Sequence, residues 1–204
     1  MNGKVTVAIL AGGRSQRMGS DKSFISFNGR PLIEHVIERV TALALPIILV
    51  ANNPEPYLPL NLPLFTDIVP DKGSLGGLYT ALSHSQTDYT LCVACDMPFL
   101  SPALLQYIIT LRKGFDAVIP QADGCSQGLH AIYHIACLSP MLRALQQDRL
   151  KISTFLSEIR VHFVEETEVR RFDPELRSFV NLNSPQELHQ AEMGNRVQKM
   201  DSLA

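Results

Sequence analysis

Residues 4–22, KVTVAILAGGRSQRMGSDK, join a short apolar run to a loop that carries three glycines and three cationic side chains. The run over residues 4–10 is rich in β-branched residues and glycines follow it, which predicts a buried strand. Pro31 begins the segment 31–44, whose apolar residues recur at helical spacing, with proline in the first turn of the predicted helix. A strand, a glycine loop and a helix in this order predict an α/β domain.

The same alternation continues along the chain. Further strands are predicted over residues 46–50, 64–65, 89–95, 115–121, 129–135, 161–166 and 179–183, and further helices over 74–85, 102–111, 137–146 and from Pro185 onward. Ser74 is the predicted N-cap of the helix 74–85. The alternation predicts the fold class α/β, a three-layer αβα sandwich with a Rossmann-like, mostly parallel mixed sheet. We expect one domain over residues 1–192 and a flexible C-terminal tail over residues 193–204.

The composition limits the class of protein. The 204 residues are 46% hydrophobic with a formal net charge of −2, so the chain has no broad basic field for nucleic acid or an anionic membrane. The N-terminus does not resemble a secretory or transit peptide, and no run approaches the ~18 apolar residues of a transmembrane helix. These features predict a cytoplasmic protein that binds neither nucleic acid nor membrane. The cysteines expected as free thiols are Cys92, Cys95, Cys125 and Cys137.

The glycine loop matches neither of the common phosphate-binding motifs. Gly13 and Gly19 enclose five residues and two more precede Lys22, which does not fit the spacing of a Walker loop. The dinucleotide pattern G-x-G-x-x-G is also absent. Backbone N–H groups beside glycines, together with Arg14, Arg17 and Lys22, nevertheless suit the binding of a phosphate group. The alternative is a solvated turn whose basic side chains face water.

Asp96 directly follows the apolar run 89–95 and precedes Met97 and Pro98. Ligands of open α/β sheets bind beyond the carboxyl ends of the strands, where the glycine loop, Asp67 and Asp96 are all predicted to lie. Phosphoryl and nucleotidyl transfer use a divalent cation to offset charge on the phosphates, and a single carboxylate suits Mg²⁺, which keeps several waters. Asp96 is therefore a candidate Mg²⁺ ligand, and the alternative is an aspartate that only caps the loop.

Four stretches of the sequence together resemble a known family. These stretches are residues 10–22 (LAGGRSQRMGSDK), 71–78 (DKGSLGGL), 95–100 (CDMPFL) and 179–188 (FVNLNSPQEL). They resemble the molybdenum cofactor guanylyltransferases, also called molybdopterin-guanine dinucleotide synthases, of the nucleotide-diphospho-sugar transferase superfamily. The resemblance spans residues 5–191. It implies that fold and the transfer of GMP from GTP to the terminal phosphate of molybdopterin or Mo-molybdopterin, with release of pyrophosphate.

The resemblance also implies a cofactor, partners and site residues. Mg²⁺ is the implied cofactor, GTP and molybdopterin are the implied substrates, and molybdenum-insertion proteins and molybdoenzyme chaperones are the implied protein partners. Arg17 and Lys22 would bind the triphosphate and act in catalysis, Asp67 would contact the nucleoside, and Asp96 would hold Mg²⁺ at the phosphates. The residues that would line the guanine pocket or continue its loop are Leu10, Ala11, Gly12 and Gly13. The residues that would face the pterin are Asn181 and Asn183.

The first motif also bears on the choice of base. Cytidylyltransferases that act on the same pterin resemble L-A-A-G where residues 10–13 are L-A-G-G, and the second glycine leaves room for a purine, which favours GTP over CTP. A molybdopterin cytidylyltransferase or a related sugar-phosphate nucleotidyltransferase is the alternative. Two positions depart from the family pattern. Val50 stands where some members have asparagine, leaving Asn52 or Asn53 as substitutes, and Gly128 stands where proline is common.

Two rival functions remain to be weighed. Residues 124–128, GCSQG, match the nucleophile elbow G-x-S-x-G, which would make Ser126 the nucleophile of a serine hydrolase. An elbow needs a strand directly before it and a helix directly after it, whereas polar residues precede this site and a predicted strand follows. The other rival is a non-catalytic paralogue that binds nucleotide or a partner protein without turnover. The presence of Lys22 and Asp96 argues against it.

Two further patterns have structural explanations. Cys92 and Cys95 form a C-x-x-C inside an apolar strand without a second pair at zinc spacing, so we expect small core residues. His130 and His134 share one face of the predicted strand 129–135 but lie about 13 Å apart, too far for one metal ion. We therefore expect surface or satisfied histidines.

Overall fold

The computed structural model describes residues 4–11, 22–182, 187–188 and 191. Within them, an eight-stranded sheet has the order β10-β7-β9-β6-β1-β4-β5, with β8 paired to β7, and β2 pairs with β3 separately. The strands are β1 (Val5–Leu10), β2 (Ser26–Phe27), β3 (Arg30–Pro31), β4 (Ile47–Val50), β5 (Leu64–Phe65), β6 (Tyr89–Ala94), β7 (Ala117–Ala122), β8 (Cys125–Ser126), β9 (His130–His134) and β10 (Val161–Val164). The α-helices are α1 (Leu32–Thr41), α2 (Gly73–His84), α3 (Pro102–Leu111), α4 (Leu138–Gln146) and α5 (Glu166–Val169).

Short 3₁₀ helices connect several of these elements. They are η2 (Lys22–Phe24), η3 (Glu55–Leu60), η4 (Ile135–Cys137), η5 (Ile152–Thr154), η6 (Leu156–Glu158) and η7 (Arg177–Phe179). Their short length is typical of connectors, because 3₁₀ hydrogen-bond geometry disfavours long runs.

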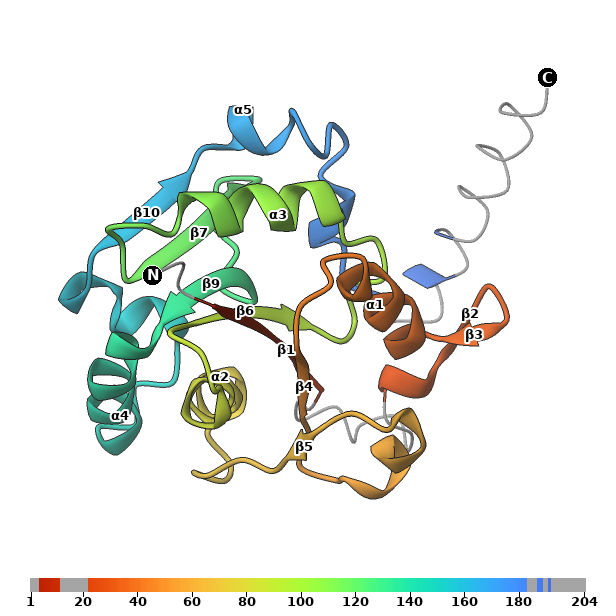
Figure 1. Ribbon diagram of the computed structural model, residues 1–204, viewed down its shortest axis with the longest axis horizontal. Helices are drawn as coiled ribbons and strands as arrows, with labels where there is room; N and C mark the ends of the chain where they lie inside the picture. Colours follow the sequence, from red (N-terminus) through yellow and green to blue (C-terminus); the bar gives the residue numbers. More distant parts are fainter. Residues whose placement is uncertain (1–3, 12–21, 183–186, 189–190, 192–204) are drawn as a thin grey trace.

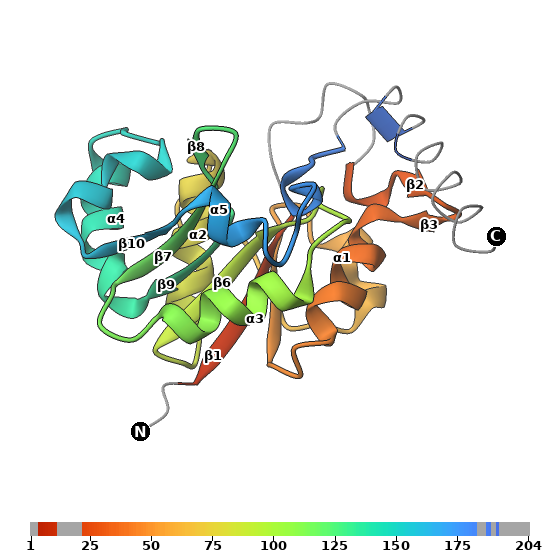
Figure 2. The ribbon, with the colours of Figure 1, turned by 90° about the horizontal axis from the view of Figure 1, so that it is seen from above.

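The sheet is mixed and mostly parallel, as predicted. β1 pairs in parallel with β4 and β6, β4 with β5, and β7 with β10, whereas β9 runs antiparallel between β6 and β7. The carboxyl ends of β1, β4, β5 and β6 therefore lie at one edge of the sheet, which we call the carboxyl edge. The β7–β8 turn and the segment that follows α5 lie on this side as well (Figure 2).

Helices cover both faces of the sheet, which confirms the three-layer fold. α1, α3 and α5 lie on one face, and α2 and α4 lie on the other (Figure 1). All six residues of β1 are buried. Ile9 belongs to the core cluster that contains Val36 of α1, and Leu10 belongs to the cluster that contains Leu78 of α2. Burial on both faces explains why β1 reads as a continuous apolar run.

Two predicted helix starts are wrong by one or two residues. Pro31 lies in β3 and is the N-cap of α1, with φ −55° and ψ 144°, so it precedes the helix. Ser74 lies inside α2, whose N-cap is Lys72. Gly73 at the first position of α2 has φ +57°, a conformation that glycine adopts without strain and that a sequence pattern does not reveal. By contrast, the predicted bounds of α3 match the structure, with the Ser101 hydroxyl accepting from the N–H of Leu104.

The predicted strand over residues 179–183 is wrong for the residues that the structure describes. Residues 177–179 form η7, and residues 180–182 belong to no strand. The Asp173 carboxylate accepts hydrogen bonds from the N–H groups of Arg177 (3.1 Å) and Ser178 (2.7 Å), which favours a turn. The N–H of Leu182 donates to the carbonyl of Asp96 and not to a strand ladder. We call residues 173–182 the C-terminal strap.

The remaining structural expectations have mixed outcomes. All four cysteines are free thiols, as expected. Cys92 and Cys95 are buried, as expected for core residues, and Cys137 is buried as well. Among the described residues, no helix has the length and apolar character needed to cross a membrane. Asn183, Pro185 and the predicted tail over 193–204 lie outside the described residues.

Candidate functional site

The ends of β1, β4 and β6 are held together beyond the strands themselves. The N–H of Ala11 donates to the carbonyl of Val50 (2.8 Å), and the N–H of Cys95 donates to the carbonyl of Leu10 (3.1 Å). These bonds fix Leu10 and Ala11, two of the residues assigned to the nucleotide, at the carboxyl edge. The sheet thus already uses the Ala11 N–H and the Leu10 carbonyl. Three other assigned residues lie outside the described residues: Gly12, Gly13 and Arg17.

Lys22 begins η2 and is held through its neighbour Ser23. The Ser23 side chain is buried, accepts a hydrogen bond from the Tyr57 hydroxyl (2.8 Å) and donates one to the Cys95 sulfur (3.1 Å). The carbonyl of Lys22 accepts from the N–H of Ile25. Lys22 therefore lies in a short turn with its own backbone hydrogen bond. The Ser23 side chain attaches this turn to Cys95, the residue that precedes Asp96.

Asp96 follows β6 at the carboxyl edge, where the sequence predicted it. Burial raises the pKa of its carboxyl group above the ordinary value, and the nearby positive charge of Lys22 acts in the opposite direction. A carboxylate that has lost hydration gains from a cation placed beside it. The electrostatics of this position therefore suit a charge-neutralising ligand.

The residues at this edge fit Mg²⁺ better than a metal that needs a full protein cage. Among the described residues, no three or more His, Cys, Asp or Glu side chains gather closely enough to hold a metal ion. Mg²⁺ commonly takes one or two carboxylates and fills its other positions with water and substrate phosphate oxygens. A single partly buried carboxylate beside a lysine is compatible with that donor set, whereas a structural zinc site needs four protein ligands.

Asp67 follows β5 and pairs reciprocally with Asn52, which follows β4. The Asn52 amide donates to Asp67 Oδ2 at 2.8 Å, and Asn52 Oδ1 accepts from the Asp67 N–H at 3.2 Å. Burial raises the pKa of Asp67, and the bond from Asn52 opposes this shift. Of the two substitutes left open for the missing asparagine at position 50, the structure therefore brings Asn52 to Asp67.

The Asp67 carboxylate packs beside two glycines of α2. A Cβ atom at Gly76 would lie 3.8 Å from Asp67 Oδ2, and one at Gly77 would lie 3.7 Å from Asp67 Oδ1, both ordinary contact distances. The close contacts at Gly76 are with the chain itself, because a Cβ atom there would lie 3.0 Å from the Lys72 Cβ and 3.1 Å from the Val69 carbonyl oxygen. Glycine at position 76 therefore suits the start of α2, and Asp67 lies against this part of the helix.

The C-terminal strap carries the one described residue assigned to the pterin. Ser178 accepts from the Ser101 N–H at 2.9 Å, which ties the strap to the start of α3. The Leu182 N–H donates to the Asp96 carbonyl at 3.0 Å. Asn181 is exposed and directly precedes Leu182. The strap therefore brings Asn181 to the same edge as Asp96, while Asn183 lies outside the described residues.

The geometry around Ser126 excludes a nucleophile elbow. Ser126 is exposed in the two-residue strand β8, which pairs antiparallel with β7. Asp123 and Gly124 join the two strands with φ values of 50° and 72°, as in a tight hairpin turn. The chain then enters β9 and not a helix, so the strand–turn–helix arrangement of an elbow is missing.

Gly128, the second departure from the family pattern, lies in a crowded position. A Cβ atom there would lie 2.9 Å from Ile152 Cγ2 and 3.3 Å from the Tyr133 hydroxyl. That hydroxyl donates to the Gly128 carbonyl at 2.8 Å. In this chain, Ile152 thus fills the space that a side chain at position 128 would need.

His130 is a titratable residue whose environment the sequence did not reveal. It is fully buried at the start of β9, with its ring centroid 4.8 Å from that of Phe179 in the strap. Among the described residues, neither ring nitrogen has a hydrogen-bond partner, so the expectation of a satisfied histidine is wrong here. Burial lowers the pKa of His130 to about 4, and the charge of Asp173 opposes the shift. His134 is only partly buried, and its Nδ1 accepts from the Ala136 N–H.

One family model and several known proteins are similar to this chain. The model describes a MobA-like NTP transferase domain and matches residues 7–162. The molybdenum cofactor guanylyltransferase of Desulfosudis oleivorans is 37% identical over 92% of this chain and 94% of its own. The probable molybdenum cofactor guanylyltransferase of Natranaerobius thermophilus is 36% identical over 94% and 96%. The crystal structure of molybdopterin-guanine dinucleotide biosynthesis protein A from Archaeoglobus fulgidus, 30% identical, has a TM-score of 0.80 and covers 92% of this chain and 97% of that chain.

Proposed function

The chain belongs to the MobA-like NTP transferase family, and we propose that it transfers GMP from GTP to the terminal phosphate of molybdopterin or Mo-molybdopterin. Lys22 and Asp96 carry the proposal, because the fold brings a cation and a partly buried carboxylate from distant segments to the carboxyl edge. The names of the relatives support the choice of substrates. The product would be the guanine dinucleotide form of the cofactor, with pyrophosphate released.

The proposed reaction is an in-line displacement at phosphorus. An oxygen of the pterin phosphate attacks the α-phosphorus of GTP, a new P–O bond forms, and the bond to the bridging oxygen of pyrophosphate breaks. The nucleophile is already anionic, so no general base is needed, and catalysis depends on positioning and charge neutralisation. Lys22 and Arg17 would bind the triphosphate. Asp96 would hold Mg²⁺, which offsets charge on the phosphates.

The remaining assigned residues would orient the two substrates. Asp67, fixed by Asn52, would contact the nucleoside, and Asn181 and Asn183 would contact the pterin. The backbone segment proposed to accept the guanine consists of Leu10, Ala11, Gly12 and Gly13. We also propose that molybdenum-insertion proteins and molybdoenzyme chaperones interact with this protein before and after the reaction.

A nucleotide competition tests the proposal. The full chain is incubated with molybdopterin, Mg²⁺ and labelled GTP or CTP, and the dinucleotide and pyrophosphate are identified. We expect the guanine dinucleotide. Preference for CTP would overturn the choice of base and favour a molybdopterin cytidylyltransferase, and nucleotide binding without product would favour a non-catalytic paralogue. Ser126→Ala serves as a control variant, because Ser126 lies in a hairpin without elbow geometry.

A further inference from the structure

A chain of buried hydrogen bonds runs between the segments that carry Lys22 and Asp96. The Tyr57 hydroxyl donates to Ser23 Oγ at 2.8 Å, and Ser23 Oγ donates to Cys95 Sγ at 3.1 Å. Tyr57, Ser23 and Cys95 are exposed by only 2%, 1% and 8%. A serine hydroxyl donates one hydrogen bond and accepts at its lone pairs, so both bonds form together. The three side chains are therefore linked through Ser23.

Two members of this chain, Ser23 and Cys95, are each adjacent to a residue assigned to the phosphates. Ser23 follows Lys22 within η2, and Cys95 directly precedes Asp96. A shift of Ser23 or Cys95 moves its neighbour, because consecutive Cα atoms are fixed about 3.8 Å apart across the peptide bond. The Ser23–Cys95 bond thus links two backbone segments that are 72 positions apart.

Tyr57 anchors this link to the rest of the fold. It lies in η3, belongs to the same core cluster as Cys95, and packs on Phe24 with ring centroids 4.9 Å apart. The Cys95 N–H donates to the Leu10 carbonyl, which attaches the chain to the end of β1. Three polar groups inside a mostly apolar cluster carry a desolvation cost that apolar side chains of similar size would not. Their hydrogen bonds fix geometry at the carboxyl edge in a way that apolar contacts do not.

We propose that Tyr57, Ser23 and Cys95 form a positioning unit that sets the separation of the Lys22 ammonium group and the Asp96 carboxylate for a metal-bound nucleoside triphosphate. The inference rests on the proposed function, because it assigns these two groups to the triphosphate and its cation. None of the three residues needs to touch substrate. They act through Lys22 and Asp96.

Tyr57→Phe and Cys95→Ala test the unit, because each removes one hydrogen-bonding group and leaves most of the packing. A displacement of reacting groups by about 1 Å can cost up to about 100-fold in rate, so we expect kcat to fall about 10-fold or more. The affinity for Mg²⁺–GTP, measured by calorimetry, should weaken as well. The KM for the pterin should stay within about twofold of that of the unaltered protein.

Two further variants separate positioning from general stability. Cys95→Ser keeps a hydrogen-bonding side chain and should recover most of the kcat lost in Cys95→Ala. Thr6→Val removes a part-buried hydrogen bond of 2.9 Å to Thr87 far from the carboxyl edge, so it should lower the melting temperature without lowering kcat. The positioning unit is overturned if Tyr57→Phe keeps both its kcat and its Mg²⁺–GTP affinity, or if Cys95→Ser performs no better than Cys95→Ala.

The same measurements distinguish failure of the unit from failure of the proposed function. If the unaltered protein forms a dinucleotide but the variants match it, the unit is wrong and the function stands. If the unaltered protein forms no dinucleotide with GTP or CTP, the function is wrong. In that case the Mg²⁺–GTP affinities alone test the positioning unit, which requires weaker binding by Tyr57→Phe than by Thr6→Val.

Discussion

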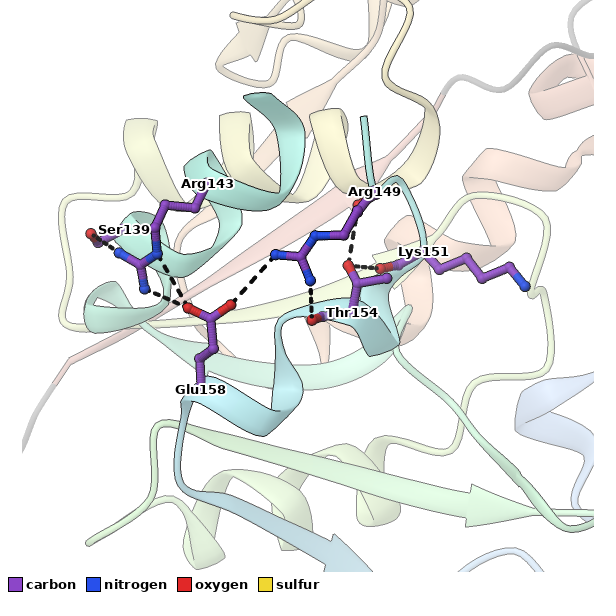
Figure 3. Close-up of polar contacts among 6 residues, drawn as sticks. All are labelled: Ser139, Arg143, Arg149, Lys151, Thr154 and Glu158. Carbon is purple, nitrogen blue, oxygen red and sulfur yellow. Dashed lines mark hydrogen bonds and ion pairs between the residues drawn. The ribbon is translucent and has the colours of Figure 1, made fainter. Parts of the chain in front are cut away.

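Glu158 lies between two arginines of the protein, whereas Asp96 lies at the carboxyl edge, where burial has the largest influence on its pKa. Arg143 contacts Glu158 Oε2 at 2.6 Å, and Arg149 lies 3.7 Å from Oε1 (Figure 3). The Thr154 hydroxyl lies 2.7 Å from the carbonyl oxygen of Lys151, to which it donates, and 3.1 Å from that of Arg149. The bonds from Arg143 lower the pKa of Glu158.

The pKa values of Asp96 and Asp67 are shifted in the opposite direction to that of Glu158. Burial raises the pKa of both carboxyl groups, and the neighbouring Lys22 and Asn52 offset this effect only in part. Arginines of the protein thus neutralise the surface carboxylate of Glu158. At the carboxyl edge, by contrast, burial has the larger influence on the carboxylates of Asp67 and Asp96. Perturbed carboxylates at such an edge are typical of functional sites, whereas ion pairs such as that of Glu158 stabilise local structure.

Asp96→Asn is the variant expected to have the largest effect. It keeps the size of the side chain but removes the charge that would hold Mg²⁺, so we expect a loss of about 10²–10³-fold in kcat. The melting temperature without nucleotide should stay the same or rise, because the variant no longer buries a charge. Steady-state kinetics and thermal unfolding measure the two quantities. Near-normal turnover would contradict the proposed mechanism.

We expect the next largest effect from His130, whose protonation lowers the stability of the fold in acid. Its folded pKa of about 4 lies below the ordinary value of 6.5, so the unfolded chain binds the proton first as the pH falls. Stability is therefore lost from about pH 6.5 downward, and the loss is complete below about pH 4. The expected loss is about 2 kcal/mol by pH 5. The nearby Asp173 charge makes the loss smaller than burial alone would.

His130→Phe should remove this loss. We expect the variant to retain more of its stability than the unaltered protein between pH 7.5 and pH 5, as measured by urea unfolding at each pH. The comparison at pH 7.5, where both side chains are uncharged, isolates the effect of packing and of the two unpartnered ring nitrogens. Parallel stability curves over this range would contradict the lowered pKa of His130 in the folded protein.

The different success of sequence reasoning in these regions has a physical cause. β1 and β6 were predictable because burial on both faces leaves continuous apolar runs, and Asp96 because it ends such a run. The position of β9, which runs antiparallel between β6 and β7, was not predictable, because a local sequence pattern does not indicate which strands pair with each other. Residues 179–182 were predicted as a strand, but the N–H groups of Phe179 and Val180 donate to the carbonyls of Leu176 and Arg177, and that of Leu182 donates to the carbonyl of Asp96.

The hydrogen bonds that support the site were not predictable either. Asn52 and Asp67 are 15 positions apart, and Ser23 and Cys95 are 72 positions apart. Such pairs form only once β1, β4, β5 and β6 are aligned in one sheet. Sequence therefore indicated which residues carry the charges, and tertiary structure was needed to find the groups that hold them.

Asn52→Leu should have a moderate effect on nucleotide binding. It removes the amide that fixes the half-buried Asp67 carboxylate, and we expect the loss of this hydrogen bond to cost about 1 kcal/mol, which corresponds to roughly fivefold in the dissociation constant for GTP. Calorimetric titration measures this constant. Asn53→Leu is the matched control, because Asn53 makes no side-chain hydrogen bond within the described residues. Equal affinities for the two variants would show that the Asn52 pair does not position Asp67 for the nucleotide.

Glu158→Gln should have the smallest effect and completes the comparison with Asp96. The pair with Arg143 is exposed, and exposed ion pairs contribute little to stability because water and salt screen them. The lowered pKa of Glu158 stabilises the fold above the ordinary value of 4.5, and this contribution is lost as the pH falls below it. We therefore expect unchanged kcat and a slightly lower melting temperature at pH 7, with the difference disappearing at high salt. A loss of turnover comparable to that of Asp96→Asn would show that the Arg143–Glu158–Arg149 cluster takes part in the reaction.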